Sequence, residues 1–179
     1  MGSRKRRRNT KAVIAGAGIL GVVCAAAVTI SSAGAAPDAS RAHCAVNVGN
    51  EEEKCFRTAK EAEQYAEVKI KDDALGAQTG VEQPTDVVIG TLFKNRRYGG
   101  GSITLWGSRP CTEDRDTGFY FNLPDDWKGK VSSVQGWAEC EITLYSRPYL
   151  GGVASPRFPD LTPVLEGQWN DYAESVEFR

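Results

Sequence analysis

The 179-residue chain has few of the residue combinations from which catalytic and zinc sites are usually built. Its one histidine is His43, and no two cysteines form a Cys-x-x-Cys pair, so a zinc site is disfavoured. It has neither a Gly-x-Ser-x-Gly motif nor a phosphate-binding glycine loop. Acidic residues are plentiful enough to supply a carboxylate pair, but no recognisable catalytic set remains, and we expect a protein that is not an enzyme.

A long apolar run lies close to the N-terminus, over residues 12–30, and a strongly basic segment precedes it. Small residues at positions 33–35 then match an Ala-x-Ala cleavage site. This order predicts a secretory signal peptide over residues 1–35, cleaved after Ala35, and a secreted, extracellular protein without membrane association after cleavage. The alternative is an uncleaved membrane anchor, because the run is nearly long enough to span a bilayer.

The mature chain is predicted to be acidic. Removal of residues 1–35 takes away six of the 22 Lys and Arg residues and none of the 23 Asp and Glu residues, which leaves a net charge of 16 − 23 = −7. This charge argues against a nucleic-acid partner and suits a cation. We expect a monomer.

Four cysteines remain after signal cleavage, an even number that suits an oxidising compartment. Three pairings are formally possible, and we predict Cys44–Cys55 and Cys111–Cys140. Zinc ligation by these thiols is the alternative, although the spacing does not favour it.

Residues 36–70 predict a small disulfide-stapled subdomain. Its expected elements are strands over residues 44–48 and 55–56 and a helix over about residues 59–68. Thr58 and Glu61 form a capping box, in which each side chain bonds the backbone amide of the other residue. The apolar side of the helix comprises Ala62, Tyr65, Ala66 and Val68. A unit this small buries little surface alone, so it either docks on the larger domain or remains loosely attached.

Residues 71–85 are polar and contain Gly76, Gly80 and Pro84, which predicts a linker. The remainder, residues 86–179, consists of short β-rich runs separated by Gly, Pro, Asp and Asn. The expected strands cover residues 87–93, 102–106, 119–121, 133–137, 141–145, 153–158 and 175–178. Such spacing predicts an antiparallel sandwich of Greek keys.

The same region contains two copies of one sequence repeat. Trp127 and Trp169 each begin an eight-residue stretch that ends in Ser-Val, and 169 − 127 = 42. Phe93 and Tyr145 begin matching aromatic and glycine-rich segments, and 145 − 93 = 52. The first copy therefore carries ten extra residues before Leu123. The expected repeats cover about residues 86–137 and 138–179.

These repeats resemble those of the βγ-crystallin superfamily, a resemblance that covers residues 86–179. A crystallin repeat begins with an aromatic, four residues, a second aromatic and a glycine, as in residues 93–99; in residues 145–151 the second aromatic is replaced by Leu150. It ends in Asn/Asp-Asn/Asp-x-x-Ser/Thr-Ser, matched by residues 170–175 and less well by residues 128–133. The resemblance implies a mainly β, two-Greek-key crystallin-like sandwich.

In microbial members that ending binds calcium, and each site draws oxygens from both repeats. The calcium ligands that the resemblance implies here are Asp171, Asn170, Tyr172, Ser132 and Glu174. Lys128 and Gly129 replace two oxygen-bearing residues in the first copy, and Glu174 replaces a hydroxyl in the second. We therefore expect at most one weak calcium site, combining Asp171 with Ser132.

A purely structural interpretation of the same residues is also open. Ser133 and Ser175 would hold loops through side-chain-to-backbone hydrogen bonds, and Trp127 and Trp169 would belong to the core.

The insertion carries Cys111 and an acidic run at residues 113–116, on a loop that a Cys111–Cys140 bridge would pin. Asp114-x-Asp116 suggests an EF-hand, but Gly118 and Phe119 fall where a ligand and the turn glycine are required. A rigid loop on a crystallin-like domain also resembles the small secreted metalloproteinase inhibitors of actinobacteria. The alternative function is thus inhibition of a secreted protease through residues 107–118.

Overall fold

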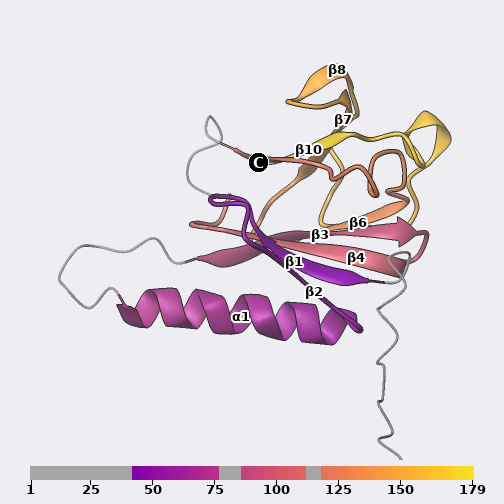
Figure 1. Cartoon of the computed structure of the whole chain (residues 1–179). Helices are drawn as coiled ribbons and strands as arrows, with labels where there is room; N and C mark the ends of the chain where they lie inside the picture. The colour runs from indigo at the N-terminus through magenta and orange to yellow at the C-terminus, as the bar shows by residue number, and fades with distance from the viewer. Residues whose placement is uncertain (1–41, 77–85, 112–117) are drawn as a thin grey trace, which may run out of the picture. The chain divides into compact units, whose positions relative to one another are not determined.

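Two β-sheets and one α-helix make up the described part of the chain, which comprises residues 42–76, 86–111 and 118–179 of a computed structural model (Figure 1). The predicted signal peptide, and parts of the predicted linker and inhibitory loop, lie outside these residues. Within the described ranges, no helix is both long enough and apolar enough to cross a membrane.

The elements follow one another in an order close to that predicted. They are β1 (His43–Asn47), β2 (Glu53–Phe56), α1 (Ala59–Gly76), β3 (Val87–Asn95), β4 (Gly99–Gly107), β5 (Phe119–Asn122), β6 (Ser133–Gly136), β7 (Ile142–Arg147), β8 (Gly151–Ala154), β9 (Leu161–Thr162), a 3-10 turn (Gly167–Trp169) and β10 (Ser175–Phe178). Strand β9 was not predicted, because its two residues carry no alternating pattern.

The two repeats exchange one strand each. The first repeat places β3, β4 and β6 in a six-stranded sheet, ordered β2-β1-β4-β3-β6-β9, and sends β5 to a four-stranded sheet, ordered β5-β10-β7-β8. The second repeat keeps β7, β8 and β10 together and sends β9 to pair with β6. The first residues of β6 and β10 differ by 42 positions and those of β4 and β8 by 52. The predicted two-Greek-key, crystallin-like sandwich with its hairpin-plus-helix extension is confirmed.

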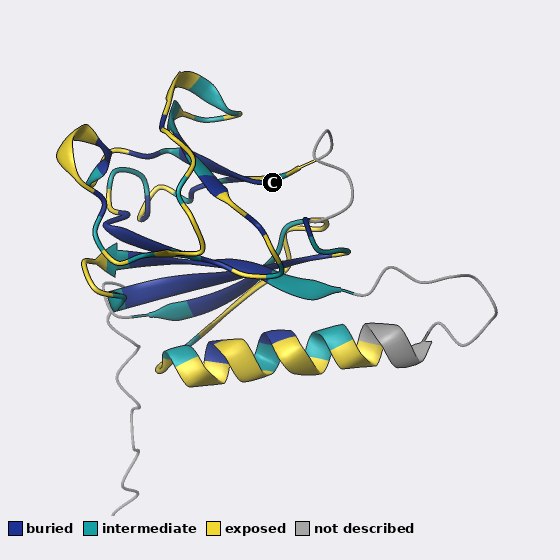
Figure 2. Ribbon diagram, turned by 180° about the vertical axis from the view of Figure 1, so that it is seen from behind, coloured by how far each residue is buried: buried dark blue, intermediate teal, exposed yellow. Residues whose placement is uncertain are grey.

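The core lies between the two sheets and is formed by side chains from both of them. In Figure 2, strands of both sheets contain buried residues, shown in dark blue. Its fully buried members include Leu92, Ile103, Leu105, Ile142, Leu144, Val176 and Phe178. Gly90 is required by this packing, because a Cβ at that position would collide with the Phe178 ring. Trp127 and Trp169 are also buried, as the structural interpretation predicted. Burial of these apolar surfaces is the main stabilising contribution to the fold.

The N-terminal extension docks on the larger domain by adding to its sheet. Strand β1 pairs in parallel with β4, and β2 pairs antiparallel with β1. Cys44 and Cys55 lie directly opposite each other in the hairpin, with Cα atoms 3.9 Å apart, and form the predicted disulfide. The second predicted disulfide, Cys111–Cys140, is also present.

Helix α1 covers the outer face of the six-stranded sheet (Figures 1 and 2). Ala62 and Ala66 are fully buried with Trp106 of β4, and Ile70 packs against the same cluster. The capping box is confirmed, since the Glu61 amide donates to Thr58 Oγ1 at 3.2 Å and the Thr58 amide donates to Glu61 Oε2 at 3.1 Å. The helix continues to Gly76, beyond residue 68 and into the predicted linker, because Ile70 prolongs the apolar side that docks.

Candidate functional site

Each repeat folds its first hairpin back on itself and fixes it with one serine. Ser133 Oγ donates to the Asn95 carbonyl at 2.6 Å and accepts from the Tyr98 amide at 3.0 Å. Ser175 makes the equivalent bonds, to the Arg147 carbonyl at 2.7 Å and from the Leu150 amide at 3.1 Å. Through these hydrogen bonds the two serines hold the hairpins in place, which is the structural role that the sequence had left open.

The loops that precede β6 and β10 meet through reciprocal backbone hydrogen bonds. The Gly129 amide donates to the Ala173 carbonyl at 2.8 Å, and the Asp171 amide donates to the Val131 carbonyl at 3.0 Å. Gly129 and Asp171 are equivalent positions in the two repeats, and both have a left-handed backbone, with φ of 65° and 57°. Aspartate tolerates this conformation better than most residues. The arrangement creates two related locations, each shared between repeats.

At the first location, the structure brings Asp171 and Ser132 together. Ser132 Oγ donates to Asp171 Oδ1 at 2.7 Å, and the Asn170 amide group donates to Asp171 Oδ2 at 2.7 Å. Ser132 is buried and Asp171 is exposed, so the carboxylate lies on the solvent side of the contact between the two loops. A carboxylate and a hydroxyl from opposite repeats thus converge, as the sequence led us to expect.

Two neighbours modify this location. Arg96 Nε donates to Asn170 Oδ1 over 3.4 Å, so the amide oxygen of Asn170 already has a cationic partner. The ring of Tyr172 packs edge-on against Trp169, with ring centres 5.9 Å apart. These contacts leave the Asp171 carboxylate and the Ser132 hydroxyl as the main side-chain oxygens available to a cation.

At the second location, Gly129 takes the place of Asp171 and Glu174 takes the place of Ser132. The Glu174 amide donates to the Tyr145 carbonyl at 2.9 Å, as the Ser132 amide does to the Phe93 carbonyl. Lys128 lies nearby and pairs with Asp125 at 2.6 Å. The hydrogen bond to Asp125 raises the pKa of Lys128, with a smaller contribution from the charge of Glu174. A fixed ammonium group beside Glu174 makes this location unfavourable for calcium.

A further cluster of ligand types occurs in the N-terminal hairpin, where Cys44, Glu53 and Cys55 hold three donor atoms within 4.8 Å of one another. The disulfide joins both sulfur atoms, so no thiolate is available to a metal ion there. Burial, and then the charge of Asp126, raises the pKa of Glu53.

His43 and Ser102 form a contact that the sequence did not reveal. The two residues are register partners in the β1–β4 pair, and His43 Nδ1 lies 2.9 Å from Ser102 Oγ. Burial lowers the pKa of His43, against the opposing charges of Glu61 and Glu63. Ser102 is fully buried within the sheet, so its hydroxyl cannot reach a substrate, and the contact serves to dock the extension. Only knowledge of the parallel β1–β4 pairing would have found it.

The strand exchange and the serine-fixed hairpins agree with the two-Greek-key fold expected from the sequence. Solved structures similar to this chain include βγ-crystallin domains from Clostridium beijerinckii (TM-score 0.39, 18% identity, 50% of this chain and 95% of that one) and Flavobacterium johnsoniae (TM-score 0.38, 20% identity, 51% and 93%). The N-terminal domain of Protein S is similar at a TM-score of 0.39 and 16% identity, over 51% of this chain and 94% of that one. No protein-family model and no curated protein sequence matches the chain.

Proposed function

We propose that this protein is a secreted, non-enzymatic, crystallin-like binding protein that holds one calcium ion weakly between its two repeats. The observation that carries the proposal is the 2.7 Å contact of Ser132 Oγ with Asp171 Oδ1, two oxygens that come from opposite repeats. Calcium prefers carboxylate, hydroxyl and carbonyl oxygens, and it reaches its coordination number by adding water where the protein supplies few ligands. The negative charge expected for the mature chain also favours a cation.

The same geometry explains why binding should be weak. The site offers one carboxylate, and Arg96 Nε contacts Asn170 Oδ1 at 3.4 Å, so a positive charge near the site opposes a second cation. An affinity on the order of 10⁻⁴ to 10⁻³ M, as in extracellular calcium modules, is therefore expected. Arg96→Gln removes that positive charge and should raise the affinity for calcium.

Calorimetric titration of the demetallated mature chain with calcium tests this function. We expect measurable heat and a higher melting temperature at millimolar calcium, and Asp171→Ala should abolish both. Because Asp171 has φ of 57°, Asp171→Asn is the better-matched variant, since asparagine tolerates that backbone while removing the charge. Asp125→Ala is the control, because Asp125 is exposed and pairs with Lys128 at the other location. Absence of heat and of any melting shift would refute the calcium site.

Inhibition of a secreted protease is the second candidate, and the Cys111–Cys140 disulfide favours it. The bridge, with the Cys111 amide bonded to the Ala138 carbonyl at 3.1 Å, anchors the start of the segment expected to enter a protease cleft. Residues 112–117 of that segment lie outside the described residues. The test is stoichiometric inhibition of a thermolysin-like enzyme. A Cys111→Ser/Cys140→Ser double variant should lose it, and a Cys44→Ser/Cys55→Ser variant should keep it.

A further inference from the structure

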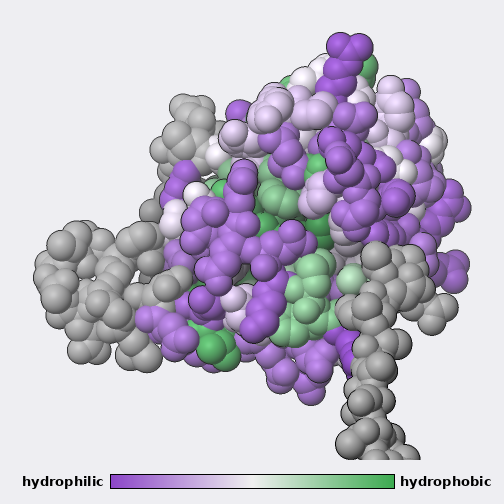
Figure 3. All heavy atoms as spheres, viewed as in Figure 1, coloured by the Kyte–Doolittle hydropathy of each residue, from purple (hydrophilic) through white to green (hydrophobic). Residues whose placement is uncertain are grey.

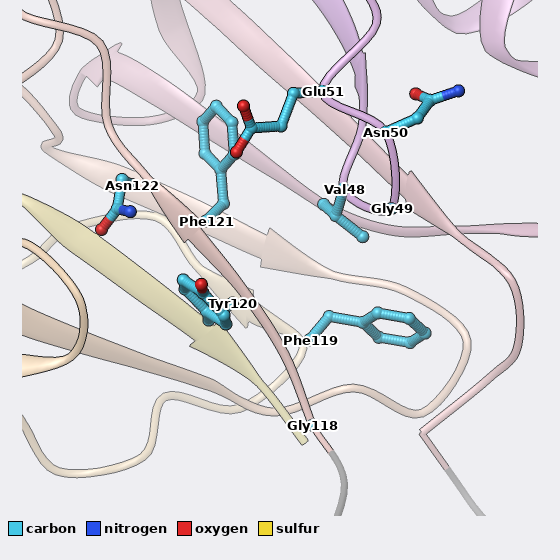
Figure 4. A pocket seen from close by; sticks show the side chains of 9 residues that line it. All are labelled: Val48, Gly49, Asn50, Glu51, Gly118, Phe119, Tyr120, Phe121 and Asn122. Atoms are coloured by element: carbon cyan, nitrogen blue, oxygen red, sulfur yellow. The ribbon is translucent and has the colours of Figure 1, made fainter.

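A groove of about 480 Å³ lies between the β1–β2 turn and strand β5 (Figure 4). Residues 48–51 line it on one side and residues 118–122 on the other, and we call it the β5 groove. Figure 3 shows a largely hydrophilic face with hydrophobic atoms visible in a hollow near the middle of the view. The residues that line the groove are far from Asp171 in the sequence, and the calcium proposal does not use them.

Strand β5 is an edge strand, so one side of its backbone is free among the described residues. It is the first strand of the four-stranded sheet and pairs only with β10. Glu141 and Arg179 exchange both backbone hydrogen bonds, at 2.7 and 3.0 Å, so residues 175, 177 and 179 bond toward β7. Because bonding alternates along an antiparallel strand, Val176 and Phe178 bond to β5, through Phe121 and Phe119.

The remaining β5 residues, Tyr120 and Asn122, therefore direct their backbone N–H and C=O groups away from β10. An extended segment can add to such an edge as a further strand, with backbone hydrogen bonds supplying affinity and alternate side chains supplying specificity. Side chains of the added strand that share the face of Phe119 and Phe121 would enter the β5 groove.

Apolar side chains line part of the groove beside polar groups, and one of the polar groups is the Glu51 carboxylate. Val48 and Phe119 are partly buried against the core, and Phe121 is 9% exposed. In Figure 4 the Glu51 side chain extends from the hairpin in the direction of β5, whereas Asn50 points the other way. In the described ranges no side-chain partner of Glu51 is found. A lysine or arginine side chain fits this combination, since its aliphatic stem packs on apolar surface while its charged end reaches a carboxylate.

We propose that the β5 groove binds an extended peptide segment of another protein, which adds to the edge of β5 and directs a lysine or arginine side chain to Glu51. Charge complementarity selects this occupant over a second copy of the chain. A second copy would present β5 itself, Phe119–Asn122, which contains no cationic residue to meet Glu51.

The probe is an acetylated and amidated peptide of about seven residues, in which threonine and valine alternate around one central lysine. The control peptide has the same sequence with glutamine in place of that lysine. Binding to the isotopically labelled mature protein is followed by NMR. The lysine peptide should bind more tightly and should slow amide exchange at Tyr120 and Asn122. Glu51→Gln should weaken the lysine peptide roughly tenfold and leave the glutamine peptide unchanged.

A matched pair of variants separates backbone addition from side-chain contact. Tyr120→Pro removes an N–H that faces away from β10, a position at which an edge strand tolerates proline, and should weaken binding by at least about tenfold. Tyr120→Ala keeps that N–H and removes a side chain that is 51% exposed, so binding should stay within about threefold of the parent. Equal binding by the two variants, equal binding of the two peptides, or no binding at roughly millimolar peptide overturns the proposal. Dimerisation that Tyr120→Pro abolishes also overturns it, because the groove would then belong to a second copy.

Discussion

Ser133 shows how one hydroxyl can hold a hairpin in place. Its oxygen bonds both the Asn95 carbonyl and the Tyr98 amide, and Ser133 itself is fully buried. Ser133→Ala leaves these two backbone groups without that partner in a partly buried setting, so it should lower the free energy of unfolding by about 1–3 kcal/mol. Urea unfolding followed by tryptophan fluorescence measures the change. Ser175→Ala should behave alike, because Ser175 makes the equivalent bonds.

The control for these variants is Ser108→Ala. Ser108 is exposed at the end of β4. Its removal should change the free energy of unfolding by no more than about 0.5 kcal/mol. If Ser133→Ala were as mild as Ser108→Ala, the serine bonds would not be what fixes the hairpin.

Helix α1 packs two alanines, Ala62 and Ala66, with Trp106 of strand β4, and this sets the distance between helix and sheet. Ala66 is fully buried against the cluster that contains Trp106. Ala66→Leu inserts methyl groups where there is no space, so it should lower the free energy of unfolding by about 1–3 kcal/mol. The same urea titration measures it, and a shift in tryptophan emission should accompany it because Trp106 lies at the contact.

Val68→Leu is the matched control on the same helix. Val68 is 53% exposed, so the added bulk remains in solvent and the effect should stay within about 0.5 kcal/mol. Equal effects at Ala66 and Val68 would show that the helix does not rest on the sheet as described.

The exchange of strands should make the two repeats unfold together. Strand β5 of the first repeat lies in the sheet of the second, and β9 of the second lies in the sheet of the first, so neither repeat can complete its sheet alone. We expect one transition, with coincident unfolding curves by circular dichroism and by fluorescence.

Core variants in either repeat provide the check on this cooperativity. Leu92→Ala and Leu144→Ala remove fully buried side chains from the first and second repeat and should each shift the whole transition by about 2–5 kcal/mol. A second transition in either variant would contradict the interlocked arrangement.

Features with short-range causes were predictable from the sequence. The Thr58–Glu61 capping box was one of them, because its donors and acceptors lie three residues apart. The repeats were another, since equal spacing of like residues implies equal structure, and β6 and β10 keep the offset of 42. The expected meeting of Asp171 with Ser132 relied on the crystallin resemblance, and the structure brings the two residues together.

The amino-acid sequence by itself determined the repeats, the helix start and most of the strands, because spacing and local hydrogen bonding act within a segment. The disulfide pairing was chosen from three formal possibilities, and the structure confirms it. Only the tertiary structure decided that β1 lies parallel to β4, that α1 rests on Trp106, and that β5 is left at an open edge. The physical reason is that strand pairing depends on which segments, distant in the sequence, compete for the same backbone hydrogen-bonding groups. A local sequence pattern does not show which of these segments will pair.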